Sequence, residues 1–292
     1  QKSADALLLA YHARRPLLVR GEPGTGKSQL ARAAACLLKR AFVPTVVHAR
    51  TEVQDLHWRF DAVARLGEAQ AIAALGHADV DVRAELAPHR YIQPGPIWWA
   101  FDWNDAQRQL DDSKIKGLVP EKPADWQPTQ GCVLLIDEID KAESDLPNGL
   151  LETLGNGAFS VDYLDRPIGQ QANAPAPLVV ITTNEERELP GAFLRRCVVL
   201  HLALPDKKNE LESFLVQRGR AHFPGKLADP VLEMAAEMVA DARGKVGTDG
   251  PLPGQAEYLD LLRALHEAHE GDTEPQLDLL KRVADFALRK QP

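Results

Sequence analysis

Short apolar runs alternate with stretches of helical periodicity along the first two thirds of the chain. Five of these runs have the length and the aliphatic or β-branched composition of buried strands, at residues 16–19, 45–49, 133–136, 178–182 and 198–202. Helical patterns lie before or between them, at 4–14, 29–40, 51–76 with a break near Gly67, and 148–154, and a polar–apolar hairpin is expected at 157–168. Strands that alternate with helices predict a parallel sheet covered on both faces.

The pattern changes after Pro205. Amphipathic helices without an intervening strand are predicted at residues 206–223, 230–242, 255–268 and 275–290. We therefore expect a three-layer αβα domain with a parallel sheet over residues 1–205 and a small α-helical domain over residues 206–292.

Residues 77–128 interrupt the regular pattern, because they are rich in proline, tryptophan and charge. We expect this stretch to be an insertion in the first domain rather than a part of its core. It gathers much of the aromatic area of the chain, in Trp98, Trp99, Phe101 and Trp103. These rings either pack inside the fold or form an exposed contact surface for a partner, and the sequence leaves both interpretations open.

The composition of the chain disfavours several classes of function. The chain has 292 residues and a net charge of −8, which disfavours nonspecific nucleic-acid binding as its main task. The three cysteines are far apart in the sequence, so neither a zinc site nor a disulfide framework is predicted. No apolar run approaches membrane-spanning length, so we expect a cytoplasmic protein that is not bound to a membrane.

The segment after the first predicted strand carries the strongest chemical motif. It reads Gly21-Glu22-Pro23-Gly24-Thr25-Gly26-Lys27-Ser28 and fits the full P-loop pattern of Gly, any four residues, then Gly-Lys-Ser. The glycines let backbone N–H groups surround a phosphate chain, and the helix that starts at Gln29 directs its positive end at the same anion. We expect this segment and Gln29 to bind ATP or ADP, with Lys27 on the β- and γ-phosphates and Ser28 on Mg²⁺.

Two acidic residues follow the third predicted strand. Asp137 and Glu138 come directly after Val133-Leu134-Leu135-Ile136, at the carboxyl end of a parallel strand, where open α/β sheets bind ligands. We expect Asp137 to hold Mg²⁺ together with Ser28, through a water molecule, and Glu138 to activate the attacking water as a general base.

Two further motifs complete the candidate site. Asn184 ends the fourth predicted strand, where its amide could orient the attacking water. Arg195 and Arg196 precede the fifth, and one of them could reach the γ-phosphate of a neighbouring subunit as an arginine finger. The alternative for the arginines is a surface ion pair with Glu185, Glu186 or Glu188.

The order of these motifs resembles that of AAA+ ATPases, and within them the MoxR group. The narrower likeness rests on Asn148-Gly149-Leu150-Leu151-Glu152, the hairpin at 157–168, and the segments 54–61 and 94–102. The chain is most similar to bacterial MoxR-like ATPases that are encoded beside von Willebrand factor A-type domain proteins. This resemblance implies ATP hydrolysis in a ring, commonly a hexamer, whose sites are completed by the next subunit, and remodelling of a protein client. By motif, Lys27 and Ser28 form Walker A, Asp137 and Glu138 form Walker B, Asn184 is sensor 1, and Arg196, with Arg195 beside it, matches the finger.

One feature departs from the family pattern. The family places an arginine at the start of a helix in the lid, the small helical domain, but this chain reads Pro253-Gly254-Gln255-Ala256 there. Arg243 or Lys245, just upstream, could take its place. The departure leaves open a switch in which ATP occupancy rather than turnover carries the message. A nucleic-acid motor or a GTP-using protein is disfavoured by the net charge.

Overall fold

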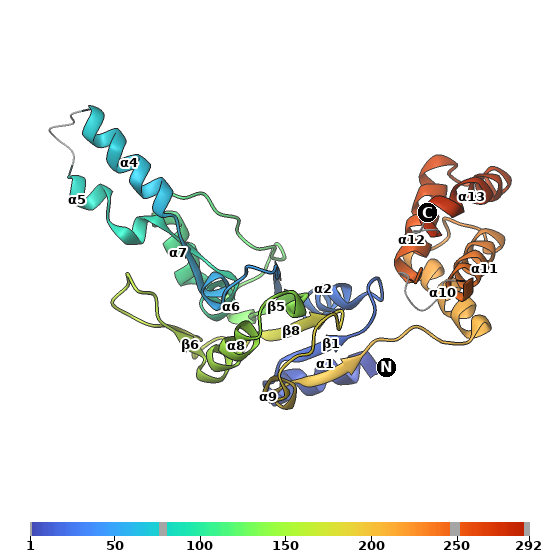
Figure 1. Cartoon of the computed structure of the whole chain (residues 1–292), viewed down its shortest axis with the longest axis horizontal. Helices are drawn as coiled ribbons and strands as arrows, with labels where there is room; N and C mark the ends of the chain where they lie inside the picture. The colour runs from blue at the N-terminus through green and yellow to red at the C-terminus, as the bar shows by residue number, and fades with distance from the viewer. Residues whose placement is uncertain (1, 76–80, 246–251, 289–292) are drawn as a thin grey trace. The chain divides into compact units, whose positions relative to one another are not determined.

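The computed structural model describes residues 2–75, 81–245 and 252–288. The chain forms two compact units. The first comprises residues 1–20 and 28–201, and the second comprises residues 21–27 and 202–292 (Figure 1). The predicted domain limits of 1–205 and 206–292 remain predictions.

The first unit is built on a parallel sheet of five strands in the order β2-β5-β8-β1-β9 (Figure 1). The strands are β1 Leu17–Arg20, β2 Ala41–Val46, β5 Cys132–Asp137, β8 Leu178–Thr183 and β9 Val198–His201. The predicted strands and their parallel arrangement are confirmed. The second strand starts four residues earlier than the predicted 45–49, because Ala41, Phe42 and Val43 are its buried residues. Pro44 is tolerated there since β2 is an edge strand and can lose one backbone N–H.

The helical predictions of this unit hold for most segments. The structure contains α1 Lys2–Ala13, α2 Lys27–Leu37, α8 Asp145–Asn156 and the short α9 Gly191–Arg196. The predicted hairpin is the antiparallel pair β6 Ala158–Phe159 and β7 Ile168–Gly169. Three short 3-10 turns, Pro88–Tyr91, Pro128–Gln130 and Ile139–Lys141, connect other elements.

The helical prediction over residues 51–76 is right for most of the stretch, but the break near Gly67 is misplaced, because it lies at residues 58–60. The structure has α3 Val53–His57, β3 Trp58–Phe60 and α4 Ala62–Leu75, and residue 76 lies outside the described residues. β3 interrupts the helix because it pairs with β4 Ile92–Pro94, a partner that no local pattern reveals. Gly67 lies inside α4, exposed and with open space around its Cα, so it costs only helix propensity there.

The expectation that residues 77–128 lie outside the core is wrong for their middle part, residues 91–109, whereas residues 81–90 and 113–125 are exposed or half-buried. Here α5 Val82–Glu85 is followed by α6 Pro96–Phe101, which packs against β2 and β5, and by α7 Trp103–Asp112. Trp98 is fully buried, and its indole Nε1 donates to Asp105 Oδ2 at 3.0 Å. Trp99, Phe101 and Trp103 are at most 7% exposed. The rings therefore pack inside the fold, and the exposed contact surface is excluded.

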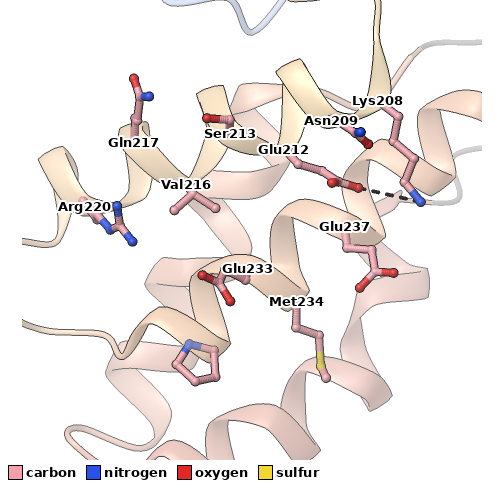
Figure 2. A pocket seen from close by; sticks show the side chains of 11 residues that line it. Lys208, Asn209, Glu212, Ser213, Val216, Gln217, Arg220, Glu233, Met234 and Glu237 are labelled. Atoms are coloured by element: carbon pink, nitrogen blue, oxygen red, sulfur yellow. Dashed lines mark ion pairs between the residues drawn. The ribbon is translucent and has the colours of Figure 1, made fainter.

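The second unit contains the predicted helices. They are α10 Lys208–His222, α11 Asp229–Lys245, α12 Gln255–Ala268 and α13 Thr273–Leu288, and the predicted residues 289–290 lie outside the described ones. Leu215, Val231, Tyr258, Leu262 and Leu280 are fully buried in a core of their own. Figure 2 shows a groove between α10 and α11, in which Glu212 points toward Lys208 and Glu233 and Glu237 line the α11 side. The distance from Lys208 Nζ to Glu212 Oε1 is 3.7 Å. No helix in the described part of the chain is long and apolar enough to cross a membrane.

Candidate active site

The P-loop connects β1 to α2 and has a backbone that only glycine accommodates at two positions. Gly21 has φ of +148°, and a Cβ there would lie 2.1 Å from the carbonyl oxygen of Leu202. Gly24 has φ of +77°, and its Cβ would lie 2.9 Å from Cβ of Ala256. Both conformations favour glycine, and any side chain would collide with residues of the same unit. The strand, loop and helix that the motif requires are therefore present.

Lys27 lies inside this loop. Its side chain is buried, and its ammonium donates to the carbonyl oxygens of Gly21 at 2.7 Å and of Glu22 at 2.8 Å. The hydroxyl of Thr25 donates to the same Glu22 carbonyl at 2.9 Å. Both carbonyl oxygens belong to the loop itself, so the ammonium is held at the place where the motif requires it. A phosphate chain surrounded by the loop would offer this ammonium a full anion.

In the first unit, the carboxyl edge of the sheet brings Ser28 and Asp137 together. Ser28 Oγ lies 2.8 Å from each carboxylate oxygen of Asp137, at the end of β5. The hydroxyl of Thr182 on β8 also donates to Asp137 Oδ1. Thr182 is fully buried, and this role was not predicted from the sequence. Ile181 is in parallel register with Ile136, so the next residues on the two strands, Thr182 and Asp137, lie side by side.

Glu138 is held from several sides at the same edge. Its backbone adopts the left-handed conformation, with φ of 60° and ψ of 50°, and its N–H donates to Thr182 Oγ1 at 2.9 Å. Asn184 Nδ2 donates to one carboxylate oxygen at 3.1 Å, and Lys141 Nζ donates to the other at 2.5 Å. The Lys141 ammonium is the main cause that lowers the pKa of Glu138 below its usual range, assisted by the Asn184 amide and opposed by burial. The carboxylate is therefore ionised at neutral pH.

Asp140 is a second residue that sequence reasoning missed. It is almost fully buried, and its carboxylate accepts from the backbone N–H of Glu186 at 2.9 Å and of Asn184 at 3.4 Å. These bonds fix the loop that carries the Asn184 amide. In the sequence, Asp140 is marked only by its position three residues after Asp137. That spacing does not show whether the carboxylate is buried and hydrogen-bonded or exposed to solvent.

Arg195 and Arg196 lie at the opposite edge of the sheet. They end α9, directly before β9, whose first residue Val198 is in register with Leu17 at the start of β1. Asp137 and Asn184, in contrast, follow the carboxyl ends of their strands. The length of β1 separates the two edges by about 10 Å. The structure thus does not bring these arginines to the Asp137 and Asn184 side chains of the same chain.

The arginines line a hollow on this side of the sheet. Its lining includes Arg14, Arg15, Arg195 and Arg196 together with Leu151 and Leu154. Among the described residues, no carboxylate lies within ion-pair distance of Arg195 or Arg196, so the ion pair weighed with Glu185, Glu186 or Glu188 is absent. Glu185 binds Arg20 instead, at 2.9 Å from its Nε.

Arg15 holds the main chain of residues 195–197. Its guanidinium donates to the carbonyl oxygens of Arg196 at 3.0 Å and of Cys197 at 3.2 Å, and also to that of Arg195. These carbonyls end α9 and have no partner within the helix. The bonds span 180 to 182 residues of sequence, which explains why no local pattern pointed to Arg15.

The known proteins that the chain resembles are distant from it in sequence. The chain is 25% identical over 255 residues to a mitochondrial Lon protease homolog of Phaeodactylum tricornutum, and the match covers 84% of this chain but only 23% of that protein. Among solved structures, a mutant of RuvB from Thermotoga maritima aligns with a TM-score of 0.49 and 16% identity, over 97% of this chain and 68% of that one. The RuvB Holliday junction branch migration motor of the same organism aligns with a TM-score of 0.45 and 16% identity, over 97% and 67%.

A family model gives the assignment. The model of the AAA domain, dynein-related subfamily, matches residues 16–218, a range that runs from the start of β1 into α10 and includes the P-loop, Asp137, Glu138 and Asn184. The chain therefore belongs to the dynein-related AAA domain family and is an AAA+ ATPase.

Proposed function

We propose that the chain hydrolyses ATP with Mg²⁺ in a MoxR-like ring and uses the cycle to remodel a partner protein. The observation that carries the hydrolytic part is the network at the carboxyl edge of the sheet. Ser28, Asp137, Glu138 and Asn184, which were chosen from separate motifs, are joined there by hydrogen bonds, directly or through Thr182.

The oxygen donors fit Mg²⁺. A serine hydroxyl and a carboxylate lie side by side, and no cluster of three or more potential metal-binding acids, histidines or cysteines occurs in the described part of the chain. Mg²⁺ is commonly held by one or two protein oxygens together with water and substrate phosphates. Ser28 and Asp137 would hold the ion, which neutralises charge on the phosphate oxygens.

Glu138 would accept the proton of the attacking water. Asn184 and Lys141 fix its two carboxylate oxygens, so the base is oriented before substrate arrives. Asn184, which Asp140 holds by its backbone, would position the same water. Lys27 and the P-loop amides would bind the phosphates, with Glu22, Pro23, Thr25 and Gln29 completing the segment.

The arginine edge supports a site that is completed by a second copy. Arg195 and Arg196 cannot serve the acidic edge of their own chain without crossing the sheet. Members of the AAA+ group commonly assemble as rings, in which such an edge faces a neighbour. Arg196, with Arg195 beside it, would stabilise the charge that develops during phosphoryl transfer.

The finer assignment rests on the sequence motifs at 54–61, 94–102 and 148–152 and on the hairpin β6–β7. They support a MoxR-like ring, in the form of a hexamer, and a client with a von Willebrand factor A-type domain. The competing proposal is an ATP-occupancy switch with little turnover, which is favoured by the lack of an arginine at the start of α12.

Specific ATPase activity at increasing protein concentration tests the proposal, with Glu138→Gln as the blank. A steep rise is expected, because each site needs a residue from another copy. A flat rate near zero with intact ATP binding would instead favour the occupancy switch.

A further inference from the structure

The carboxylate of Glu22 has a partner that the P-loop motif does not explain. Glu22 is the second residue of the loop, and its Oε2 accepts from Arg243 Nη2 at 2.7 Å. Arg243 Nη1 also donates to the carbonyl oxygen of Pro253 at 3.3 Å. The guanidinium thus connects the phosphate-binding loop to the segment that leads into α12. All of these residues belong to the same compact unit.

The first residues of α12 lie against the same loop. Ala256 occupies the space beside Gly24, and the amide nitrogen of Gln255 lies 3.5 Å from the position of a Cβ on Gly26. Gln255 is only 8% exposed, and its Oε1 has no hydrogen-bond partner in the described ranges 2–75, 81–245 and 252–288. A buried amide oxygen without a partner is unfavourable, so its retention beside the loop points to a ligand. The 14-residue helix also directs the positive end of its dipole at this place.

A hollow opens next to these contacts. Its volume is about 600 Å³, which is within the range of small-molecule sites. Its lining includes Glu22, Arg243 and Lys245 together with Lys208, Asp206 and Leu252. Lys208 is already paired with Asp241, whereas Arg243 is the cation that reaches the P-loop.

We propose that Arg243 and Gln255 contact the bound nucleotide, and that Glu22 holds Arg243 until the phosphates replace it. The proposal rests on the ATPase function above and names residues in place of the arginine that α12 lacks. The Glu22 side chain is 48% exposed, so its ion pair is weakened by water and is readily exchanged. A terminal phosphate carries more charge than a carboxylate and accepts both N–H groups of a guanidinium.

This arrangement predicts opposite effects for the two partners of one ion pair. If Arg243 binds phosphate, Arg243→Ala lowers the affinity for ATP by about tenfold or more, and the affinity for ADP by less. Glu22→Gln frees the guanidinium and raises the affinity for ATP. The double variant behaves as Arg243→Ala alone, because Glu22 acts only through Arg243.

Calorimetric titration of the full chain with ATP and with ADP, in the presence of Mg²⁺, measures these effects. All variants are made in the Glu138→Gln background so that ATP persists. Lys245→Ala is the matched control, since it removes a cation from the same hollow without an ion pair to the P-loop, and a change below about twofold is expected. Gln255→Arg, which places a cation at the start of α12, is expected to restore ATP affinity to Arg243→Ala.

Four results would overturn the proposal. If Glu22→Gln and Arg243→Ala weaken ATP binding to the same extent, the ion pair is only a structural tether. If Lys245→Ala has the larger effect, Lys245 is the ligand instead. If the chain binds neither nucleotide in any variant while its thermal unfolding is unchanged, the proposed ATPase function fails as well. If the chain binds ATP but Arg243→Ala leaves the ATP-to-ADP affinity ratio unchanged, only the role of Arg243 fails and the proposed ATPase function stands.

Discussion

The two edges of the parallel sheet differ in how their polar groups are satisfied. At the carboxyl edge, Asp137, Glu138 and Asn184 are bonded to one another or to Ser28, Thr182 and Lys141. At the amino edge, Arg15 holds the backbone of residues 195–197, while the side chains of Arg195 and Arg196 have no carboxylate partner among the described residues. The polar side chains of the first edge are ordered by these bonds, and the second edge offers positive charge without a counter-charge among the residues that the structure describes. This difference is what we expect if the reaction needs two copies.

The largest effect is expected from the carboxyl edge. Glu138→Gln keeps the hydrogen bond to the Asn184 loop region but removes the proton acceptor, so kcat should fall by about 10⁴-fold while ATP binding persists. Single-turnover and steady-state assays with radiolabelled ATP measure it. Glu186→Gln, a neighbouring exposed acid, is the control. Multiple turnovers in Glu138→Gln would remove this residue from the role of base.

At the amino edge, Arg196→Ala should lower kcat by about 10³-fold, because charge on the transferred phosphoryl group loses its partner. The sharper measurement mixes wild-type and variant chains. Activity should drop below the wild-type fraction, since each variant chain inactivates a neighbour. Activity strictly proportional to the wild-type fraction would show that Arg196 does not act on the site of a neighbouring chain. The difference between the two edges would then not reflect a site shared by two copies.

A smaller effect is expected for Arg15, which acts on the finger only by position. Arg15→Ala should lower kcat by about tenfold with little change in KM. Water would replace Arg15 on the carbonyls that end α9, but Arg195 and Arg196 would lose their fixed direction. Arg15→Lys should recover part of the loss through one donor. A change in KM equal to that in kcat, or no recovery by lysine, would contradict a positioning role.

The last prediction concerns the stability of the fold rather than the rate of the reaction. It sets the pH range in which the activities of the two edges can be compared. His57 stacks on Phe159, its Nε2 lies 2.9 Å from Thr153 Oγ1, and burial lowers its pKa from 6.5 to about 4. The unfolded chain therefore binds more protons between these values, and stability falls as the pH drops below 6.5. The full effect, complete only below pH 4, is at most about 3 kcal/mol.

Urea unfolding at pH 7.5 and pH 5 measures this dependence. His57→Gln, which does not titrate, should show a smaller loss of unfolding free energy between the two pH values than the wild type. An equal loss in both proteins would mean that His57 is not responsible.

The catalytic motifs could be predicted because each lies in a contiguous segment. A P-loop needs glycines at fixed spacing, and Asp137 and Glu138 need only follow an apolar strand. Thr182, Asp140 and Arg15 were missed because their partners are brought close by strand register and by contacts over long sequence distances. The same limitation led to the error at residues 77–128, where composition resembled an exposed insertion.

The sequence by itself determined the order of the five strands of the parallel sheet, the P-loop, the acidic strand end and the helices of the second unit. These follow from local periodicity and from backbone requirements that a few residues satisfy. Only the tertiary structure decided that the tryptophans are buried, since Trp98 needs Asp105 as a partner for its indole. It also decided that Arg243 rather than Lys245 reaches Glu22, 221 residues away in sequence. Arg243 and Lys245 are both cations, and contacts between distant segments determine which of them reaches Glu22. Local sequence patterns carry no information about such contacts.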